Sequence, residues 1–190
     1  MKNIAIFASG SGTNAENIIK YFSTRNSAKV KLVLSNRRDA LVLKRAEALM
    51  TDAVFFDRDD LCLNGKVAGY LESYKIDFIA LAGFLWLVPP QIIKSYHNRI
   101  INIHPALLPL YGGKGMYGDK VHKAVISGRE KESGITIHYV NDIYDNGDII
   151  FQARCQVFPD DTPESLASRI HALEYMYFPG IIEDLVKKLP

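Results

Sequence analysis

Short apolar segments alternate with segments of helical apolar spacing along the first half of the chain, and this order leaves few folds open. The pattern predicts strands at residues 3–8, 30–35, 53–56, 77–82 and 99–104, and helices at 15–22, 40–50 and 65–74. Strands that alternate with helices favour a mainly parallel sheet with helices on both faces. We therefore predict an α/β fold with a Rossmann-like sheet.

The pattern changes in the second half of the chain. Segments 133–140 and 148–157 are strand-like and are joined by a polar turn, which predicts an antiparallel strand pair. Thr162, followed by a proline and a glutamate, predicts the start of a terminal helix over 162–189. We expect Pro179 to divide this segment into two helices.

Length and composition narrow the functional classes. The 190 residues show no repeat or linker, so we expect one domain over 1–190. Lys and Arg number 23 against 21 Asp and Glu, far from the basic excess of a nucleic-acid-binding domain. The longest uncharged apolar run, 78–88, is about half the length that crosses a bilayer, and no signal-peptide pattern is present. We expect a cytoplasmic protein without a nucleic-acid or membrane partner.

A glycine-rich segment, residues 9–14 (SGSGTN), directly follows the first predicted strand and opens the first helix. Main-chain N–H groups at such a turn, together with the helix N-terminus, can hold a phosphate group. A strand-to-helix turn that binds no ligand could also require these glycines, for its backbone geometry alone. The residues Gly10, Gly12 and Ala15 further match a dinucleotide fingerprint. Because Arg37 and Arg38 stand where an NAD enzyme places an acid, only an NADP-binding oxidoreductase remains as that alternative.

Asn102 and His104 lie two residues apart at the carboxyl end of a predicted strand, so they share one face of the sheet. An imidazole that exchanges protons near neutral pH and an amide that holds an oxyanion together suit acyl transfer. Asp145 lies in the turn between the last two strands, and a carboxylate beside His104 would raise the pKa of that imidazole toward or above neutrality. Acids are also ordinary turn residues, and the sequence alone leaves both interpretations open.

Five segments of the chain, in order and spacing over nearly its whole length, resemble the phosphoribosylglycinamide formyltransferases of the 10-formyltetrahydrofolate-dependent family. These segments are 9–14, 81–84, 102–109 (NIHPALLP), 133–138 and 145–150. The resemblance implies transfer of a formyl group from 10-formyltetrahydrofolate, a co-substrate, to the amine of 5-phosphoribosylglycinamide. It implies no metal ion and only small-molecule partners, in a monomer or homodimer.

The resemblance also implies site residues. Asn102 and protonated His104 would stabilise the oxyanion, and Asp145 would support the charge of His104 and assist proton transfer. The substrate phosphate would lie on Gly12, Thr13 and Asn14, and Glu174 would hold the ribose hydroxyls. The folate would contact Asn102, Leu81, Phe84, Leu85, Trp86, Leu87 and Val88, with its pteridine edge near residues 141–145. Phosphate binding would thus fall mainly in residues 1–100, and catalysis and folate binding in 101–190.

The chain departs from the family pattern at two places. Trp86 stands where many members carry an arginine, and Arg58 matches a second arginine only loosely, so contacts to the folate glutamate tail are open. The stretch 110–121 is long and rich in glycine, which predicts a mobile lid without a catalytic residue. We expect supporting or structural roles for His122 and His138, and surface or packing roles for His97 and His171. Formylation of methionyl-tRNA or of an amino sugar nucleotide, and hydrolysis of formyl-folate, are the alternatives within the family.

Overall fold

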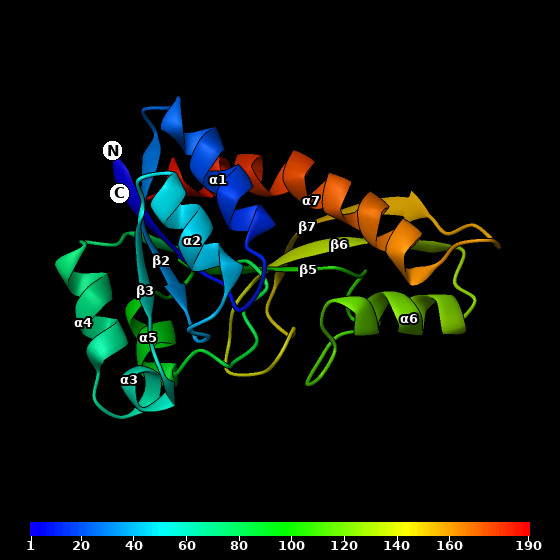
Figure 1. The fold of residues 1–190 in the computed structure, drawn as a ribbon, viewed down its shortest axis with the longest axis horizontal. Coiled ribbons are helices and arrows are strands. Elements are labelled where there is room, and N and C mark those ends of the chain that lie inside the picture. The colour runs from blue at the N-terminus through cyan, green and yellow to red at the C-terminus, as the bar shows by residue number, and fades with distance from the viewer.

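Seven strands form one continuous sheet in the computed structural model, which describes all 190 residues (Figure 1). The strands are β1 (Lys2–Phe7), β2 (Ala28–Ser35), β3 (Asp52–Phe55), β4 (Phe78–Leu81), β5 (Ile100–His104), β6 (Glu132–Tyr139) and β7 (Ile149–Gln156). Their order across the sheet is β3-β2-β1-β4-β5-β6-β7. Strands β1 to β5 pair in parallel, while β6 pairs antiparallel with both β5 and β7. The predicted fold class and the antiparallel strand pair are confirmed.

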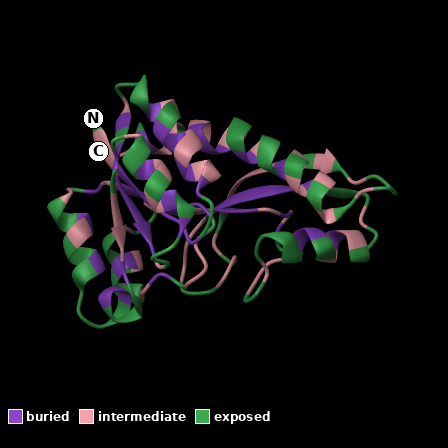
Figure 2. Cartoon of the chain, viewed as in Figure 1, coloured by how far each residue is buried: buried purple, intermediate pink, exposed green.

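Helices cover both faces of this sheet. They are α1 (Thr13–Ser23), α2 (Leu41–Ala48), α3 (Arg58–Cys62), α4 (Lys66–Ser73), α5 (Pro90–Ser95), α6 (Asp119–Ser127) and α7 (Pro163–Val186). Alternate residues of β1 point to opposite faces, so Ile4 and Ile6 join a core with α1, α2, α6 and α7, whereas Ala5 and Phe7 join a core with α3, α4 and α5. Burial on both faces explains why the central strands are uniformly apolar (Figure 2).

Helix α7 is continuous from Pro163 to Val186, and the expected break at Pro179 is wrong. The predicted start is confirmed, because the Thr162 side chain accepts a hydrogen bond from the Ser165 N–H. Pro179 has no N–H to donate to the carbonyl of Tyr175, four residues earlier. That carbonyl instead accepts a hydrogen bond from the Asn17 side chain at 3.0 Å. A contact from α1 therefore replaces the missing helical bond, which composition along α7 could not reveal.

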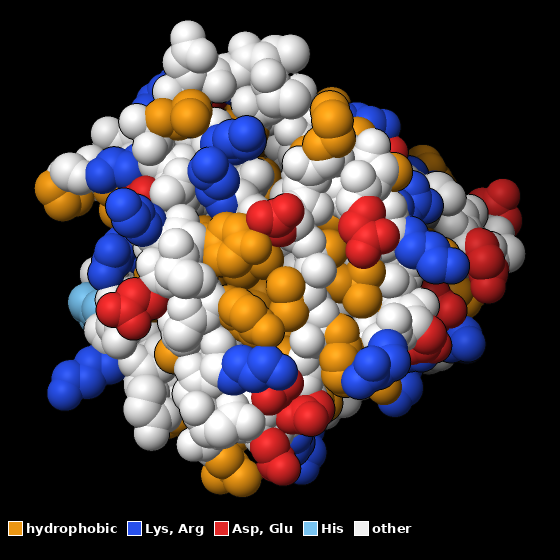
Figure 3. All heavy atoms as spheres, turned by 60° about the vertical axis from the view of Figure 1, so that its left-hand side comes forward, with side chains coloured by type: hydrophobic (Ala, Val, Ile, Leu, Met, Phe, Trp, Pro, Cys, Tyr) orange, Lys and Arg blue, Asp and Glu red, His pale blue; other side chains and the backbone are white.

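Helices α3, α5 and α6 were not predicted from the sequence. The first two have only 5 and 6 residues, too short for an apolar period to be visible. Helix α6 follows the glycine-rich stretch directly and buries Val121, His122 and Val125. No helix in the structure is long and apolar enough to cross a membrane. The face of the molecule in Figure 3 carries interspersed basic and acidic side chains around a central group of hydrophobic ones, in keeping with the nearly balanced charge.

Candidate active site

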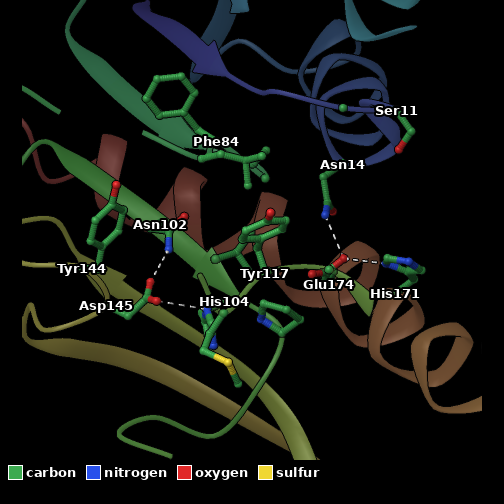
Figure 4. A pocket seen from close by; sticks show the side chains of 18 of the residues that line it. Ser11, Asn14, Phe84, Asn102, His104, Tyr117, Tyr144, Asp145, His171 and Glu174 are labelled. Carbon is green, nitrogen blue, oxygen red and sulfur yellow. Dashed lines mark hydrogen bonds and ion pairs between the residues drawn. The ribbon is translucent and has the colours of Figure 1, made fainter. Parts of the chain in front are cut away.

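A cavity of about 460 Å³ lies at the carboxyl ends of β1, β4 and β5. This edge is where open α/β sheets bind ligands. Its wall is completed by the β6–β7 loop, the glycine-rich stretch, α6 and α7. Two clusters of polar side chains face each other across it, with Tyr117 between them: Asn102, His104 and Asp145 on one side, and Asn14, His171 and Glu174 on the other (Figure 4).

The first cluster brings together three residues that are distant in sequence. Nδ1 of His104 lies 3.5 Å from Oδ2 of Asp145, and the Asn102 amide donates to Oδ1 of Asp145 at 3.3 Å (Figure 4). The side chains of His104 and Asp145 are 4% and 11% exposed. The β6–β7 turn therefore does carry its acid to the histidine, which spacing alone left open. An imidazole, a carboxylate and an amide at one point can hold a developing negative charge and exchange a proton.

Strand β6 supports this cluster from the side. Its His138 faces Asn102 across the antiparallel pair, with 3.1 Å between Nε2 of the histidine and the Asn102 amide nitrogen. Because an amide nitrogen can only donate, Nε2 of His138 accepts, and its Nδ1 donates to the carbonyl of Tyr139 at 2.7 Å. His138 thus orients Asn102, in line with the supporting role expected for it.

Asp145 is placed by the backbone of its own turn. It has a positive φ of 52°, and the N–H of Gly113 donates to its Oδ2 at 2.9 Å. A Cβ at Gly147, two residues later, would stand 1.8 Å from the carbonyl oxygen of Tyr139, so this turn requires glycine there. Burial alone would raise the pKa of Asp145, but the net shift is downward, and the Gly113 N–H is one of the groups that favour the charged form.

The expected rise in the pKa of His104 is wrong. Burial disfavours the imidazolium and lowers this pKa below its ordinary value of 6.5, although Asp145 and the carbonyl of Tyr111 oppose the shift. The carboxylate alone would raise this pKa, but the loss of water around a ring that is only 3% exposed outweighs it. His104 is therefore neutral at neutral pH in the free protein, ready to accept a proton.

The glycine-rich loop after β1 lines the far end of the cavity and is clamped by α2. Gly12 has φ of 77°, and a Cβ there would stand 2.4 Å from Val42. The Val42 N–H donates to the carbonyl of Gly10 at 3.2 Å, and Arg45 donates to that of Ser11 at 3.0 Å. Because these carbonyls are hydrogen-bonded to α2, the loop turns its N–H groups toward the cavity. The N-terminus of α1 also faces the cavity, and its first-turn N–H groups have no intrahelical partner. This arrangement suits an anion.

Glu174 lies beside that loop and is held through one oxygen only. Asn14 and His171 both contact its Oε2, at 2.8 and 2.9 Å, so neither engages Oε1 (Figure 4). Its side chain is 6% exposed. His171, expected in a surface or packing role, instead lines the cavity, and its hydrogen bond to Glu174 raises its pKa. The three-residue spacing of His171 and Glu174 on a helix was the available signal.

A second, smaller cavity of about 40 Å³ adjoins the first at Asn102 and Asp145. It is lined by five of the apolar residues that the sequence suggested for folate, namely Leu81, Phe84, Trp86, Leu87 and Val88. Leu85 lines the larger cavity instead. Leu81 and Val88 are buried in the core, so their packing role is substantial. The Arg58 guanidinium lies 5.7 Å from the centre of the Trp86 ring.

Further cavity residues come from segments to which the sequence assigned no role in binding. Residues 113–118 of the glycine-rich stretch line the larger cavity, including Met116 and Tyr117. His122 of α6 is also in the wall, buried, with its Nδ1 unpartnered. Their position over the site fits the predicted lid, whose movement stays a prediction. Arg37 and Arg38 do not line the cavity, and Arg37 pairs with Asp39 at 3.3 Å, which removes the support for an NADP site.

Comparisons with known proteins agree on one family. The formyl transferase family model matches residues 2–182. A phosphoribosylglycinamide formyltransferase of Haemophilus influenzae is 36% identical, with 96% of this chain and 86% of that protein covered. One from Bacillus subtilis is 34% identical, covering 98% and 95%. The crystal structure of the enzyme from Anaplasma phagocytophilum superposes with a TM-score of 0.90 at 33% identity, covering 98% and 87% of the two chains.

Proposed function

The chain belongs to the formyl transferase family and formylates phosphoribosylglycinamide in purine biosynthesis, and we propose that 10-formyltetrahydrofolate is its formyl donor and that Asn102, His104 and Asp145 are its catalytic residues. The observation that carries the catalytic assignment is the buried contact of His104 with Asp145, 3.5 Å apart, at the junction of the two cavities.

The reaction needs a proton acceptor and a holder of negative charge at one point. The substrate amine forms a bond to the formyl carbon, and the carbonyl electron pair moves onto the formyl oxygen. The weaker contact of the Asn102 amide, 3.3 Å to Asp145, is the one that this oxygen would replace. The proton released by the amine passes to Nδ1 of His104, beside Asp145. When the bond to folate N10 breaks, that proton goes to N10 and the carbonyl re-forms.

The low pKa of His104 serves this sequence. A neutral imidazole accepts the proton from the amine, and the resulting imidazolium lies next to both the Asp145 carboxylate and the new oxyanion. The positive charge therefore forms only where negative charges compensate for its burial. The family resemblance implies a protonated His104, and in this sequence of steps the ring becomes protonated when it takes up the amine proton.

The substrate and the folate would occupy different parts of the site. The loop at Gly12, Thr13 and Asn14 would hold the phosphate, and Glu174, through Oε1, would accept hydrogen bonds from the ribose hydroxyls. The flat folate ring would lie in the apolar slot at Phe84, Trp86 and Leu87, with Leu81, Leu85 and Val88 behind it. Arg58, near Trp86, is a cation that could meet the glutamate tail. We place this activity in one cytoplasmic domain, 1–190, with catalysis and folate binding mainly in 101–190.

A direct assay tests the function. Purified protein is mixed with 10-formyltetrahydrofolate, and release of tetrahydrofolate is followed with phosphoribosylglycinamide, methionyl-tRNA or an amino sugar nucleotide as the acceptor, or with none. We expect release only with phosphoribosylglycinamide. Release without an acceptor would instead indicate a hydrolase, and release with another amine would reassign the substrate.

Replacing Glu174 by glutamine tests the ribose contact. The amide keeps the shape of the side chain but removes its charge, so we expect the KM for phosphoribosylglycinamide to rise about 10-fold, with kcat and the KM for folate little changed. The matched control is Glu183→Gln on the same helix, because Glu183 bonds Ser27 and Tyr21 and does not line the cavity. An unchanged KM in Glu174→Gln would remove this residue from substrate binding.

A further inference from the structure

Tyr111 touches the catalytic cluster through its backbone rather than its ring. Its carbonyl oxygen lies 2.7 Å from Nε2 of His104. Two residues later, the N–H of Gly113 donates to Oδ2 of Asp145 at 2.9 Å. The short segment 111–113 therefore contacts both members of the histidine and aspartate pair.

The carbonyl of Tyr111 determines which nitrogen of His104 carries the proton. A carbonyl oxygen can only accept, so Nε2 must be the donor. Both ring nitrogens face an acceptor, but Nε2 lies 2.7 Å from the Tyr111 carbonyl whereas Nδ1 lies 3.5 Å from the Asp145 carboxylate. Only the first distance is that of a normal hydrogen bond, so the single N–H of the neutral imidazole lies on Nε2. Nδ1 is then a lone pair that points toward Asp145, 3.5 Å away, and is free to take up a proton.

The ring of Tyr111 fixes the position of this carbonyl. Its hydroxyl donates to Oε1 of Glu130 at 2.8 Å, in the segment that follows α6. The backbone of Tyr111 has a positive φ of 56°, which a residue with a side chain adopts only when its surroundings hold it there. A Cβ at Gly128 would stand 2.3 Å from the tyrosine hydroxyl, so Gly128 leaves the space that the ring needs. Gly112 is likewise enclosed, with its Cβ position 2.5 Å from Leu108 and 3.3 Å from Asp145.

We propose that Tyr111 is a positioning residue for catalysis: its hydroxyl, anchored to Glu130, holds its carbonyl on Nε2 of His104 and so sets the tautomer in which Nδ1 is the proton acceptor. The inference deepens the proposed function, because it names the catalytic nitrogen and the part of the chain that selects it. Neither Tyr111 nor Glu130 lines either cavity of the site, so their effect on the reaction passes through His104.

Nitrogen-15 NMR of the histidine side chains tests the tautomer without turnover. In the wild-type protein at neutral pH, two-bond nitrogen–proton couplings should show His104 protonated at Nε2. In Tyr111→Phe, where the anchor is lost, we expect a mixture of the two tautomers. Wild-type His104 protonated at Nδ1, or an unchanged pattern in Tyr111→Phe, would overturn the proposal. A protein without turnover would contradict the proposed function and still give this result.

Kinetics supply the second readout. We expect Tyr111→Phe and Glu130→Ala each to lower kcat about 10-fold, with the KM of both substrates unchanged, because a misplaced catalytic group costs rate rather than affinity. The double variant should be no slower than either single one, since the two residues act as one unit. Tyr21→Phe is the control, because Tyr21 makes the same kind of contact, 2.8 Å to Glu183, away from the site. A kcat for Tyr111→Phe equal to that of Tyr21→Phe would contradict the proposal.

Discussion

Replacing His104 by alanine is expected to lower kcat by at least about 100-fold, because the group that accepts the amine proton is lost. Asp145→Ala should lower kcat by a similar factor, since the imidazolium would then form in a buried position without its carboxylate. His97→Ala is the control, because that histidine is exposed and does not line the cavity. Thermal unfolding should show that each variant remains folded. A near-normal kcat in either variant would remove that residue from the mechanism.

The pH dependence of kcat/KM tests which protonation state of His104 is active. Because neutral His104 is the active form, kcat/KM should fall as the pH drops through its pKa, which lies below 6.5. The charge of Asp145 raises that pKa, so Asp145→Asn should move the acid limb to still lower pH while it lowers the rate. An acid limb above pH 6.5 in the wild type would contradict the neutral state assigned to His104.

Asn102→Ala is expected to lower kcat by about 100- to 1000-fold, the usual effect of losing one preorganised donor to an oxyanion. The variant also frees Asp145 and His138 from their contacts with the amide, at 3.3 and 3.1 Å. For this reason Asn102→Ser, which keeps a shorter donor, should recover part of the rate. Asn17→Ala serves as the control, because Asn17 donates to a carbonyl of α7 and not to the site. A kcat for Asn102→Ala within a few-fold of the wild type would exclude this residue as the oxyanion donor.

Much of the fold follows from local patterns. The strands β1, β2, β4 and β5 were predictable because each is a short apolar run between turns, and their parallel order follows from the helices between them. The local pattern did not indicate the continuity of α7, because the carbonyl that Pro179 leaves without a helical donor is bonded by the Asn17 side chain, from the opposite end of the chain. Short helices such as α3 carry too few residues for periodicity to mark them.

The site, like the fold, was predictable where it depends on local patterns and not where it depends on distant contacts. Asn102 and His104 could be placed on one face from their spacing, and the anion-binding loop from its glycines and its position before a helix. The pKa of His104 could not be given the right direction, because it depends on burial by elements far along the chain. Tyr111 gave no signal at all, since its contact with His104 is made by a main-chain oxygen that every residue type has.

The most direct test of the account follows the formyl group itself. The protein is supplied with 10-formyltetrahydrofolate carrying carbon-13 in the formyl group, together with phosphoribosylglycinamide, and the products are resolved by NMR. We expect the wild-type protein to place all of the label in the formamide of the ribonucleotide, and His104→Ala to form almost none in the same time. Label recovered as free formate, or labelled ribonucleotide formed by His104→Ala at the wild-type rate, would contradict it.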